Sequence, residues 1–181
     1  MTSEAGLRET LVAAALGILE ADGEEPSLRA VARAAGVSAM APYRHFPNKV
    51  ALMAAVANHG FEALHGVLVL ADDKPDPREA LVAQGLAFVE FATKHPPLFR
   101  LMYSHRYGSA GTDAVMGTYR VLADRVADIL PTQVSAGALA CRALAQGIAT
   151  ILLNDRLAPS TADDIATALR LFAYGAEHAV P

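Results

Sequence analysis

The chain has 181 residues, of which 53% are hydrophobic and 19% charged, so it has the apolar content of a folded protein and too few charges for a disordered one. Cys141 is its only cysteine, which excludes an intrachain disulfide scaffold and fits a reducing compartment. The net charge of -4 does not by itself suggest a nucleic-acid partner.

The charges are unevenly distributed along the chain. Residues 26–61 contain four basic side chains (Arg29, Arg33, Arg44 and Lys49) and no acidic one, whereas the remainder has 11 basic and 19 acidic side chains. The segment therefore carries +4 and the remainder -8. Such a separation is typical of a chain whose basic part faces a polyanion, and an ordinary solvated face is the alternative.

Apolar residues recur at helical spacing along nearly the whole chain, so we predict an all-α protein of about nine helices. A first amphipathic helix ends at Gly23. Ser27 is predicted to cap a second, short helix that Gly36 ends. Ser38 is predicted to cap a third helix of barely two turns, which Pro47 ends.

The other helices are predicted from the same periodicity. Asn48 caps a long fourth helix that runs to about residue 71, where a segment rich in proline and aspartate breaks it. The last five helices are predicted over 78–94, 97–103, 113–129, 135–154 and 162–177. Because the fourth helix is expected to connect two parts, we place the domain boundary near residue 50, with a helix-turn-helix domain over 1–50 and a helical domain over 51–181.

Residues 28–46 (LRAVARAAGVSAMAPYRHF) have the features of a helix-turn-helix. Ala32 is small enough for a second helix to cross closely, Gly36 makes the turn, and Val37 fills the angle between the helices. Such a unit exposes the start of its second helix to the major groove of DNA. The apolar pattern alone would also fit an ordinary helical corner.

Side chains suited to phosphate oxygens follow the turn. Tyr43, Arg44 and His45 are consecutive, and Lys49 stands at the start of the next helix. Phenol, guanidinium, imidazole and ammonium groups all donate hydrogen bonds to phosphate, and such contacts fix the register of a protein on DNA without reading its sequence. Phe46 is expected to be a core residue that holds the third helix in place.

The segment VSAMAPYRHFPNKVAL, with Leu28-Arg29 and Ala32 upstream of it, resembles the DNA-binding domain of the TetR family of transcriptional regulators. The spacing Tyr-x-His-Phe-x-x-Lys before an apolar helix carries the likeness. The resemblance implies phosphate contacts at the tyrosine, histidine and lysine and base contacts at the three residues before the proline. The predicted DNA-binding residues are Ser27, Arg29, Ser38, Ala39, Met40, Ala41, Tyr43, Arg44, His45 and Lys49.

The three positions expected to face base edges, Ala39, Met40 and Ala41, are small or apolar. They can touch thymine methyl groups but cannot make the bidentate hydrogen bonds that read purines. Sequence preference would therefore depend also on Arg29 or Arg44, or on DNA shape.

Six of the 11 aromatic residues lie between residues 88 and 119. Aromatic and methionine side chains on facing helices can line a cavity, and a plain hydrophobic core fits the same pattern. The family resemblance implies that a small effector binds among these helices and changes DNA binding. The predicted ligand-binding residues are Phe88, Phe91, Phe99, Met102, Tyr103, Met116 and Tyr119.

The last two predicted helices carry faces rich in small residues, which let helices approach closely, as at a seam between two chains. The faces consist of Ala136, Ala140, Ala143 and Gly147 on one helix and Ala162, Ile165, Ala166, Leu169, Phe172, Ala173 and Ala176 on the other. We predict a homodimer through these helices. Its two-fold symmetry would place two reading heads about one DNA turn apart and require a near-palindromic operator of double-stranded DNA.

Motifs of the common enzyme classes are missing from the sequence, which has no dinucleotide fingerprint, phosphate-binding loop, zinc-protease motif or nucleophile elbow. Its six histidines lack metal-ligand spacing. We therefore predict no enzyme, no cofactor and no metal site.

The function predicted from these features is a repressor that a small apolar or amphipathic ligand releases from DNA. A carrier or sensor of apolar ligands without DNA binding is the alternative, and it would leave the basic segment unexplained. Without a signal peptide or a run of about 18 uninterrupted apolar residues, we expect a cytoplasmic protein without membrane contact.

Overall fold

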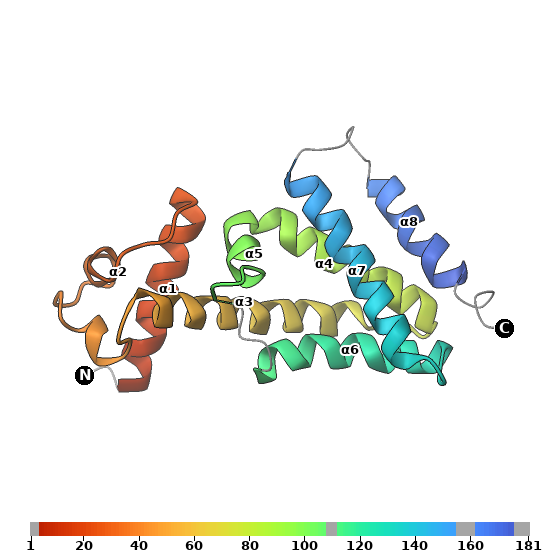
Figure 1. Cartoon of the computed structure of the whole chain (residues 1–181), viewed down its shortest axis with the longest axis horizontal. Coiled ribbons are helices and arrows are strands. Elements are labelled where there is room, and N and C mark those ends of the chain that lie inside the picture. The colour runs from red at the N-terminus through yellow and green to blue at the C-terminus, as the bar shows by residue number, and fades with distance from the viewer. Residues whose placement is uncertain (1–3, 108–111, 155–161, 176–181) are drawn as a thin grey trace. The chain divides into compact units, whose positions relative to one another are not determined.

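The computed structural model describes residues 4–107, 112–154 and 162–175 (Figure 1). These ranges contain eight α-helices and one 3₁₀ helix and no strand, which confirms the prediction of an all-α protein. The chain divides into two compact units, one made of residues 1–61 and 95–112 and the other of residues 62–94 and 113–181. Helix α3 contributes its first half to one unit and its second half to the other, whereas the predicted functional boundary near residue 50 stays a prediction.

The first unit contains the helices that the sequence predicts for a helix-turn-helix, together with a later short helix. Its elements are α1 (Glu4–Asp22), α2 (Leu28–Ala34), the 3₁₀ helix η1 (Pro42–Arg44), the first half of α3 (Lys49–Ala71) and α5 (Pro96–Met102). Helix α1 contacts α2 and α5, and α2 contacts η1. The core of this unit is formed by fully buried side chains, which include Leu11, Val31, Phe46, Leu52 and Met53.

Local sequence explains the ends of α2. The Ser27 hydroxyl accepts a hydrogen bond from the Ala30 N–H at 3.1 Å, which caps the helix as predicted. At the other end Gly36 has a φ of 67°, a left-handed conformation that glycine adopts without strain. The Val37 N–H then bonds to the Ala32 carbonyl at 3.0 Å and closes a Schellman turn. This turn sets the direction in which the chain leaves α2.

Helices α3 and α5 approach each other closely at Gly60. A Cβ atom added there would lie 2.6 Å from Sδ of Met102 and 3.0 Å from Cδ1 of Leu98. Beside this contact the rings of Phe61 and Tyr103 meet edge to face with centroids 5.6 Å apart. A side chain at position 60 would therefore have to displace the side chain of Met102.

The second unit contains the end of α3 and four further helices. They are α4 (Pro77–Lys94), α6 (Asp113–Ile129), α7 (Val134–Leu153) and α8 (Ala162–Gly175). Helix α4 contacts α6, α7 and α8 and is the central helix of the unit. Each bound of α4, α6, α7 and α8 lies within two residues of its prediction.

Asp72, the first residue after α3, joins three helices of the second unit. Its Oδ1 accepts hydrogen bonds from Gln84 Nε2 on α4 at 2.6 Å and from Arg125 Nε on α6 at 2.7 Å. Arg125 also donates to the Asp72 backbone carbonyl at 3.1 Å. The break after α3 is thus held by buried and half-buried polar groups.

Helix α8 packs on α4 through residues that the sequence led us to assign to the dimer face. Leu169 and Ala173 are buried in a cluster with Val82 of the same chain, and a Cβ added at Gly85 would lie 2.8 Å from Cδ2 of Leu169. The assignment of Leu169 and Ala173 to the seam is therefore wrong. An alanine-rich apolar face fits a neighbouring helix of the same chain as well as a second chain.

The third predicted helix is also wrong in type. Residues 38–46 form successive turns and the short 3₁₀ helix η1, with the Ala41 N–H bonded to the Ser38 carbonyl at 2.9 Å and the Arg44 N–H to the Ala41 carbonyl at 3.2 Å. Pro42 has no N–H, so it cannot make the bond back to Ser38 that an α-helix requires. Tighter i to i+3 bonds take its place.

Among the described residues, α3 and α7 are long and apolar enough to cross a membrane by length and composition alone. In α3, 44% of the apolar window is buried within the chain, as in a core helix. In α7 only 17% is buried. Helix α7 is therefore an apolar helix that the single chain leaves largely uncovered.

Candidate nucleic-acid interface

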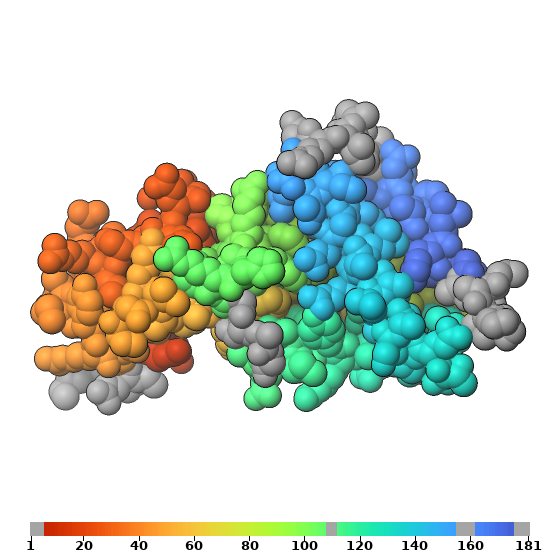
Figure 2. Space-filling model, viewed as in Figure 1, coloured from red at the N-terminus to blue at the C-terminus, as the bar shows by residue number. Residues whose placement is uncertain are grey.

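The segment from Ser38 to His45 lies at the surface of the first unit, in the orange part of Figure 2. Within it Met40 is 66% exposed and Tyr43 is 44% exposed, and Arg44 is also exposed. Pro42 and Phe46 are buried, and the Phe46 N–H bonds to the Pro42 carbonyl at 2.8 Å. The two buried residues anchor the segment, so the side chains between and before them point outward.

Phe46 is the core residue that the sequence predicts. Its side chain is 2% exposed, and the Arg8 guanidinium of α1 lies 5.2 Å from the ring centroid. This cation–π contact ties the end of the exposed segment to α1. The outward residues are thus presented by an anchored backbone.

The other predicted contacts lie close in sequence to this segment or at the ends of its neighbouring helices. Ser38, Ala39 and Arg29 are exposed, whereas Ala41 and His45 are half-buried. Ser27 is exposed too, and its hydroxyl oxygen is already occupied as the cap of α2. Asn48 caps α3 through a bond from the Ala51 N–H to its Oδ1 at 2.9 Å, as predicted.

Lys49, at the start of α3, is paired with an acidic residue. Its ammonium lies 3.1 Å from Oε2 of Glu25 and donates to the Glu25 backbone carbonyl at 3.0 Å. The Tyr107 hydroxyl donates to the same Oε2 at 2.8 Å. Burial alone would raise the pKa of Glu25, but the hydrogen bonds from Tyr107 and Lys49 outweigh it and lower the pKa of this carboxyl.

Sequence reasoning missed Glu25 and Tyr107. They are separated by 82 positions, and neither stands in a recognisable motif. Tyr107 belongs to the aromatic-rich stretch, and nothing in its spacing distinguishes a hydroxyl that binds a carboxylate from one that lines a pocket. Only the fold brings the two residues together.

The predicted ligand-binding residues are divided between the two units. Phe99, Met102 and Tyr103 lie in the first unit, and Phe88, Phe91, Met116 and Tyr119 lie in the second. The phenylalanines and Met102 are buried, Met116 is 41% exposed, and Tyr119 stacks with Arg142 at 4.3 Å. Each group is packed within its own unit, and their joint role in ligand binding stays a prediction.

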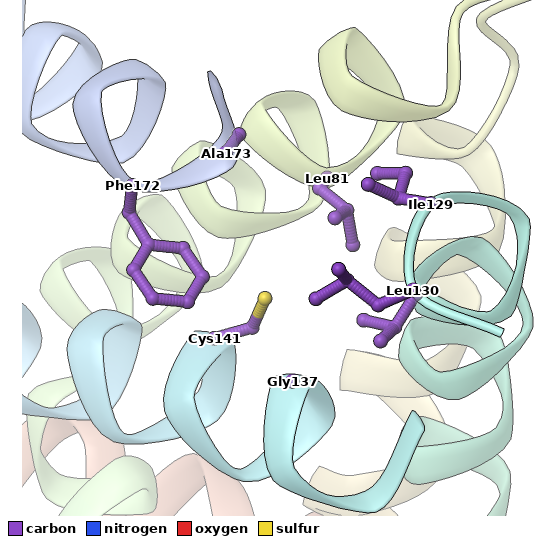
Figure 3. Close-up of a pocket in the computed structure, with 8 residues that line it drawn as sticks. Leu81, Ile129, Leu130, Gly137, Cys141, Phe172 and Ala173 are labelled. Atoms are coloured by element: carbon purple, nitrogen blue, oxygen red, sulfur yellow. The ribbon is translucent and has the colours of Figure 1, made fainter. Parts of the chain in front are cut away.

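A small apolar cavity lies within the second unit, with the Cys141 sulfur pointing into it (Figure 3). Its volume of about 10 Å³ leaves room for no more than a water molecule. The cavity is lined by Leu81, Val126, Ile129, Leu130, Gly137, Cys141, Phe172 and Ala173. Desolvation raises the pKa of the Cys141 thiol to about 11, so it stays protonated at neutral pH.

Among the described residues, no group of three or more histidine, cysteine, aspartate or glutamate side chains could hold a metal ion.

Two family models match the chain. Residues 11–56 match the model "Bacterial regulatory proteins, tetR family", and residues 81–174 match "Tetracyclin repressor-like, C-terminal domain". The first match includes α2, the exposed segment and the start of α3, and the second covers α5 and most of the second unit. Comparison with curated proteins gives no match.

Solved structures share the fold over nearly the whole chain. A protein of unknown function from Rhodococcus sp. RHA1 is 32% identical, with a TM-score of 0.80 over 93% of this chain and 94% of that one. A TetR variant from Acinetobacter baumannii AYE in complex with minocycline is 23% identical, with a TM-score of 0.71 over 94% of this chain and 96% of that one.

A further relative by fold is the transcriptional regulator FadR from Bacillus subtilis in complex with stearoyl-CoA. It is 12% identical, with a TM-score of 0.69 over 92% of this chain and 98% of that one. At such identities these likenesses establish the fold, whereas the two family models establish the family. The chain belongs to the TetR family of DNA-binding transcriptional regulators, which combine an N-terminal helix-turn-helix with a C-terminal ligand-binding domain.

Proposed function

We propose that the chain is a cytoplasmic, homodimeric repressor that binds a near-palindromic operator and is released from it by a small apolar or amphipathic ligand. It acts by binding rather than by catalysis. The observation that carries the proposal is the segment of residues 38–45, which is anchored by buried Pro42 and Phe46 and exposes Met40 before Pro42 and Tyr43 and Arg44 after it.

Within this segment the contacts to DNA divide by chemistry. Tyr43, Arg44 and His45, together with Lys49, donate to phosphate oxygens and position the protein. Met40 and its two alanine neighbours face the base edges, where apolar side chains favour the methyl group of thymine. Arg29, exposed on α2, is proposed as a further cation that contacts the DNA.

The dimer is supported by the surface of α7. Its small-residue face of Ala136, Ala140, Ala143 and Gly147 is exposed or half-exposed in the single chain, and Leu139 on the same face is 67% exposed. Figure 2 shows α7, in cyan and blue, at the surface of the second unit. An exposed leucine among small residues is the surface on which a second helix packs closely. On α8 the large hydrophobic residues that are exposed are Leu171 and Tyr174, which replace Leu169 and Ala173 as candidates for the seam.

The effector is proposed to bind among the aromatic and methionine side chains of the predicted set. Minocycline and stearoyl-CoA, held by two proteins of the same fold, both combine apolar surface with polar groups. In composition the predicted set has the same balance, because it includes buried phenylalanines and the hydroxyl-bearing residues Tyr103 and Tyr119. An amphipathic compound is therefore the class of effector to screen first.

A gel-shift with the DNA upstream of the chain's own coding region tests the repressor. Retardation at low salt is expected. Arg44→Ala should weaken DNA binding because Arg44 is an exposed cation in the segment of residues 38–45. Arg120→Ala, which removes an exposed cation from α6, is the matched control and should leave the shift unchanged. Absence of any retardation by the wild-type protein at low salt would exclude DNA binding at this site.

A further inference from the structure

Three side chains of the first unit connect the proposed phosphate contact Lys49 to the segment that follows α5. They are Glu25, Lys49 and Tyr107, and we call them the Glu25 cluster. Lys49 Nζ lies 3.1 Å from Oε2 of Glu25, and the Tyr107 hydroxyl donates to that same oxygen at 2.8 Å. One carboxylate oxygen therefore accepts from a cation and from a phenol at once.

The charge states of the Glu25 cluster are fixed near neutral pH. Burial raises the pKa of Glu25, but the bonds from Tyr107 and Lys49 dominate and bring the net pKa below its ordinary value, so the carboxylate is ionised. Burial and the bond to Glu25 raise the pKa of Tyr107, so its hydroxyl keeps the proton that it donates.

The two partners of Glu25 differ in their access to solvent. Tyr107 is 4% exposed, whereas the Lys49 side chain is 43% exposed. The tyrosine is thus held in the interior, and the ammonium group can turn outward to a phosphate by rotation of its flexible side chain. When Lys49 turns to a phosphate it loses its ion pair with Glu25, so the carboxylate and the DNA compete for the same ammonium group.

We propose that Glu25 competes with DNA phosphate for Lys49 and that the Tyr107 hydroxyl sets the strength of this competition. The inference rests on the proposed DNA-binding function. While Oε2 accepts from Tyr107, the carboxylate attracts Lys49 less strongly, and the ammonium exchanges to phosphate more readily. If the Tyr107 hydroxyl moves away from Oε2, this oxygen accepts only from Lys49 and attracts the ammonium group more strongly. The contact between Lys49 and phosphate then weakens.

The position of Tyr107 makes it responsive to α5. Phe99, Met102 and Tyr103 of the proposed ligand set lie on or next to this helix, within eight residues of Tyr107. The turn between α5 and Tyr107 is hydrogen-bonded, from the Ser104 N–H to the Leu101 carbonyl at 3.2 Å and from the Tyr107 N–H to the Ser104 carbonyl at 3.4 Å, so a ligand that displaces α5 also moves the chain that follows. The Glu25 cluster gives such a ligand a route to Lys49 that requires no rearrangement of residues 38–46.

The first test is a mutant cycle with a fluorescent duplex of random sequence at low salt, because phosphate contacts do not depend on base sequence. Glu25→Gln should raise affinity about three- to fivefold, the effect of releasing one partly exposed ion pair. Glu24→Gln removes the same charge from the preceding, exposed position and should change affinity by less than about twofold. In a Lys49→Ala background the additional gain from Glu25→Gln should disappear.

An equal gain from Glu25→Gln with and without Lys49 would show a general charge effect and overturn the inference. The outcome is separable from failure of the proposed function. A wild-type protein that binds no duplex refutes DNA binding itself, and the inference with it. A wild-type protein that binds, with additive effects of the two substitutions, refutes only the competition.

The second test removes the Tyr107 hydroxyl alone. Tyr107→Phe keeps the ring, whose centroid lies 5.4 Å from the Arg106 guanidinium, and should weaken DNA binding about two- to threefold. The same substitution in the Glu25→Gln background should have no effect on binding. Thermal unfolding of each variant shows whether the fold is retained, and Tyr107→Trp offers a second variant without the phenol. Weakening that persists without the Glu25 charge would overturn the role of Tyr107.

Discussion

Gly60 of α3 and Met102 of α5 touch so closely that a Cβ atom on Gly60 would lie 2.6 Å from the methionine sulfur. Met102 is 1% exposed, so its side chain is packed in the interior of the first unit. The backbone of one helix therefore serves as the packing surface for a side chain of the other.

Two glycines of α3 should respond oppositely to alanine. Gly66→Ala meets no atom within 4 Å and should stabilise the protein by about 0.5 to 1 kcal/mol, the helix preference of alanine over glycine. Gly60→Ala has the same preference but overpacks the contact with Met102, which costs about 1 to 3 kcal/mol. Urea unfolding of both variants measures the difference. Equal stabilisation by the two substitutions would contradict the close approach of α3 and α5.

Charges placed on exposed leucines of the last two helices should dissociate the proposed dimer. Leu139→Glu on α7 and Leu171→Glu on α8 introduce carboxylates where the single chain leaves leucines 67% and 72% exposed. Leu70→Glu, at an 80% exposed leucine of α3, is the control. Sedimentation velocity should show monomers for the first two and a dimer for the control. Dimers in all three cases would place the seam elsewhere.

Substitutions at a proposed phosphate contact and at a proposed base contact should have different effects on DNA binding. Lys49→Ala should weaken binding to every sequence and reduce the slope of log affinity against log salt by about 0.9, the value for one phosphate contact. Met40→Gln should instead change the preferred base, because glutamine can bind adenine bidentately. Selection from a random library, repeated at several salt concentrations, tests both. A changed sequence preference in Lys49→Ala would contradict the division.

The Glu25 cluster predicts two losses of stability at opposite ends of the pH range. Because the pKa of Glu25 is lower in the folded protein than in the unfolded chain, its carboxylate stabilises the fold at pH values above the pKa of the unfolded state. This stabilisation is lost as the pH falls through the pKa of the folded state. Because the pKa of Tyr107 is higher in the folded protein than in the unfolded chain, its protonated hydroxyl stabilises the fold at pH values below the pKa of the unfolded state. This stabilisation is lost as the pH rises through the pKa of the folded state. Glu25→Gln should thus flatten the acid side of a stability profile and Tyr107→Phe the alkaline side. Thermal melts across pH, compared with Glu24→Gln, measure both changes.

Cys141 should react slowly with thiol reagents while the protein is folded. Its pKa of about 11 leaves little thiolate at pH 8, so reaction should be at least about tenfold slower than for a free thiol. Denaturation should restore the ordinary rate, and because the chain has one cysteine the signal has a single source. Fast reaction of the native protein would mean that the small cavity opens readily.

The sequence predicts most helix ends because local chemistry determines them. Ser27 and Asn48 cap helices with their own side chains, and Gly36 has the left-handed conformation that ends α2. The sequence-based prediction of an α-helix is wrong at residues 38–46, and Pro42 is the reason. A proline in a first turn is compatible with an α-helix, but in this segment of two turns Pro42 cannot donate to the Ser38 carbonyl, and the tighter 3₁₀ form results.

For the site, the exposed residues of the segment 38–45 follow from the motif, whereas the pairing of Lys49 with Glu25 does not. Nothing near Lys49 in sequence indicates that Glu25 would bind it, because a surface lysine and a loop glutamate are common everywhere. The face of α8 shows the same limit: Leu169 and Leu171 are both apolar, and only packing against α4 decides which is buried.

The hydrogen bonds of Asp72 couple the end of α3 to helices α4 and α6. Since its carboxylate binds both Gln84 of α4 and Arg125 of α6, unravelling the last turn of α3 would remove a hydrogen-bond acceptor from a buried amide and from a guanidinium in the same event. The amide protons of these three helix segments should therefore exchange with solvent as one cooperative unit, rather than fraying independently from the proline-rich break.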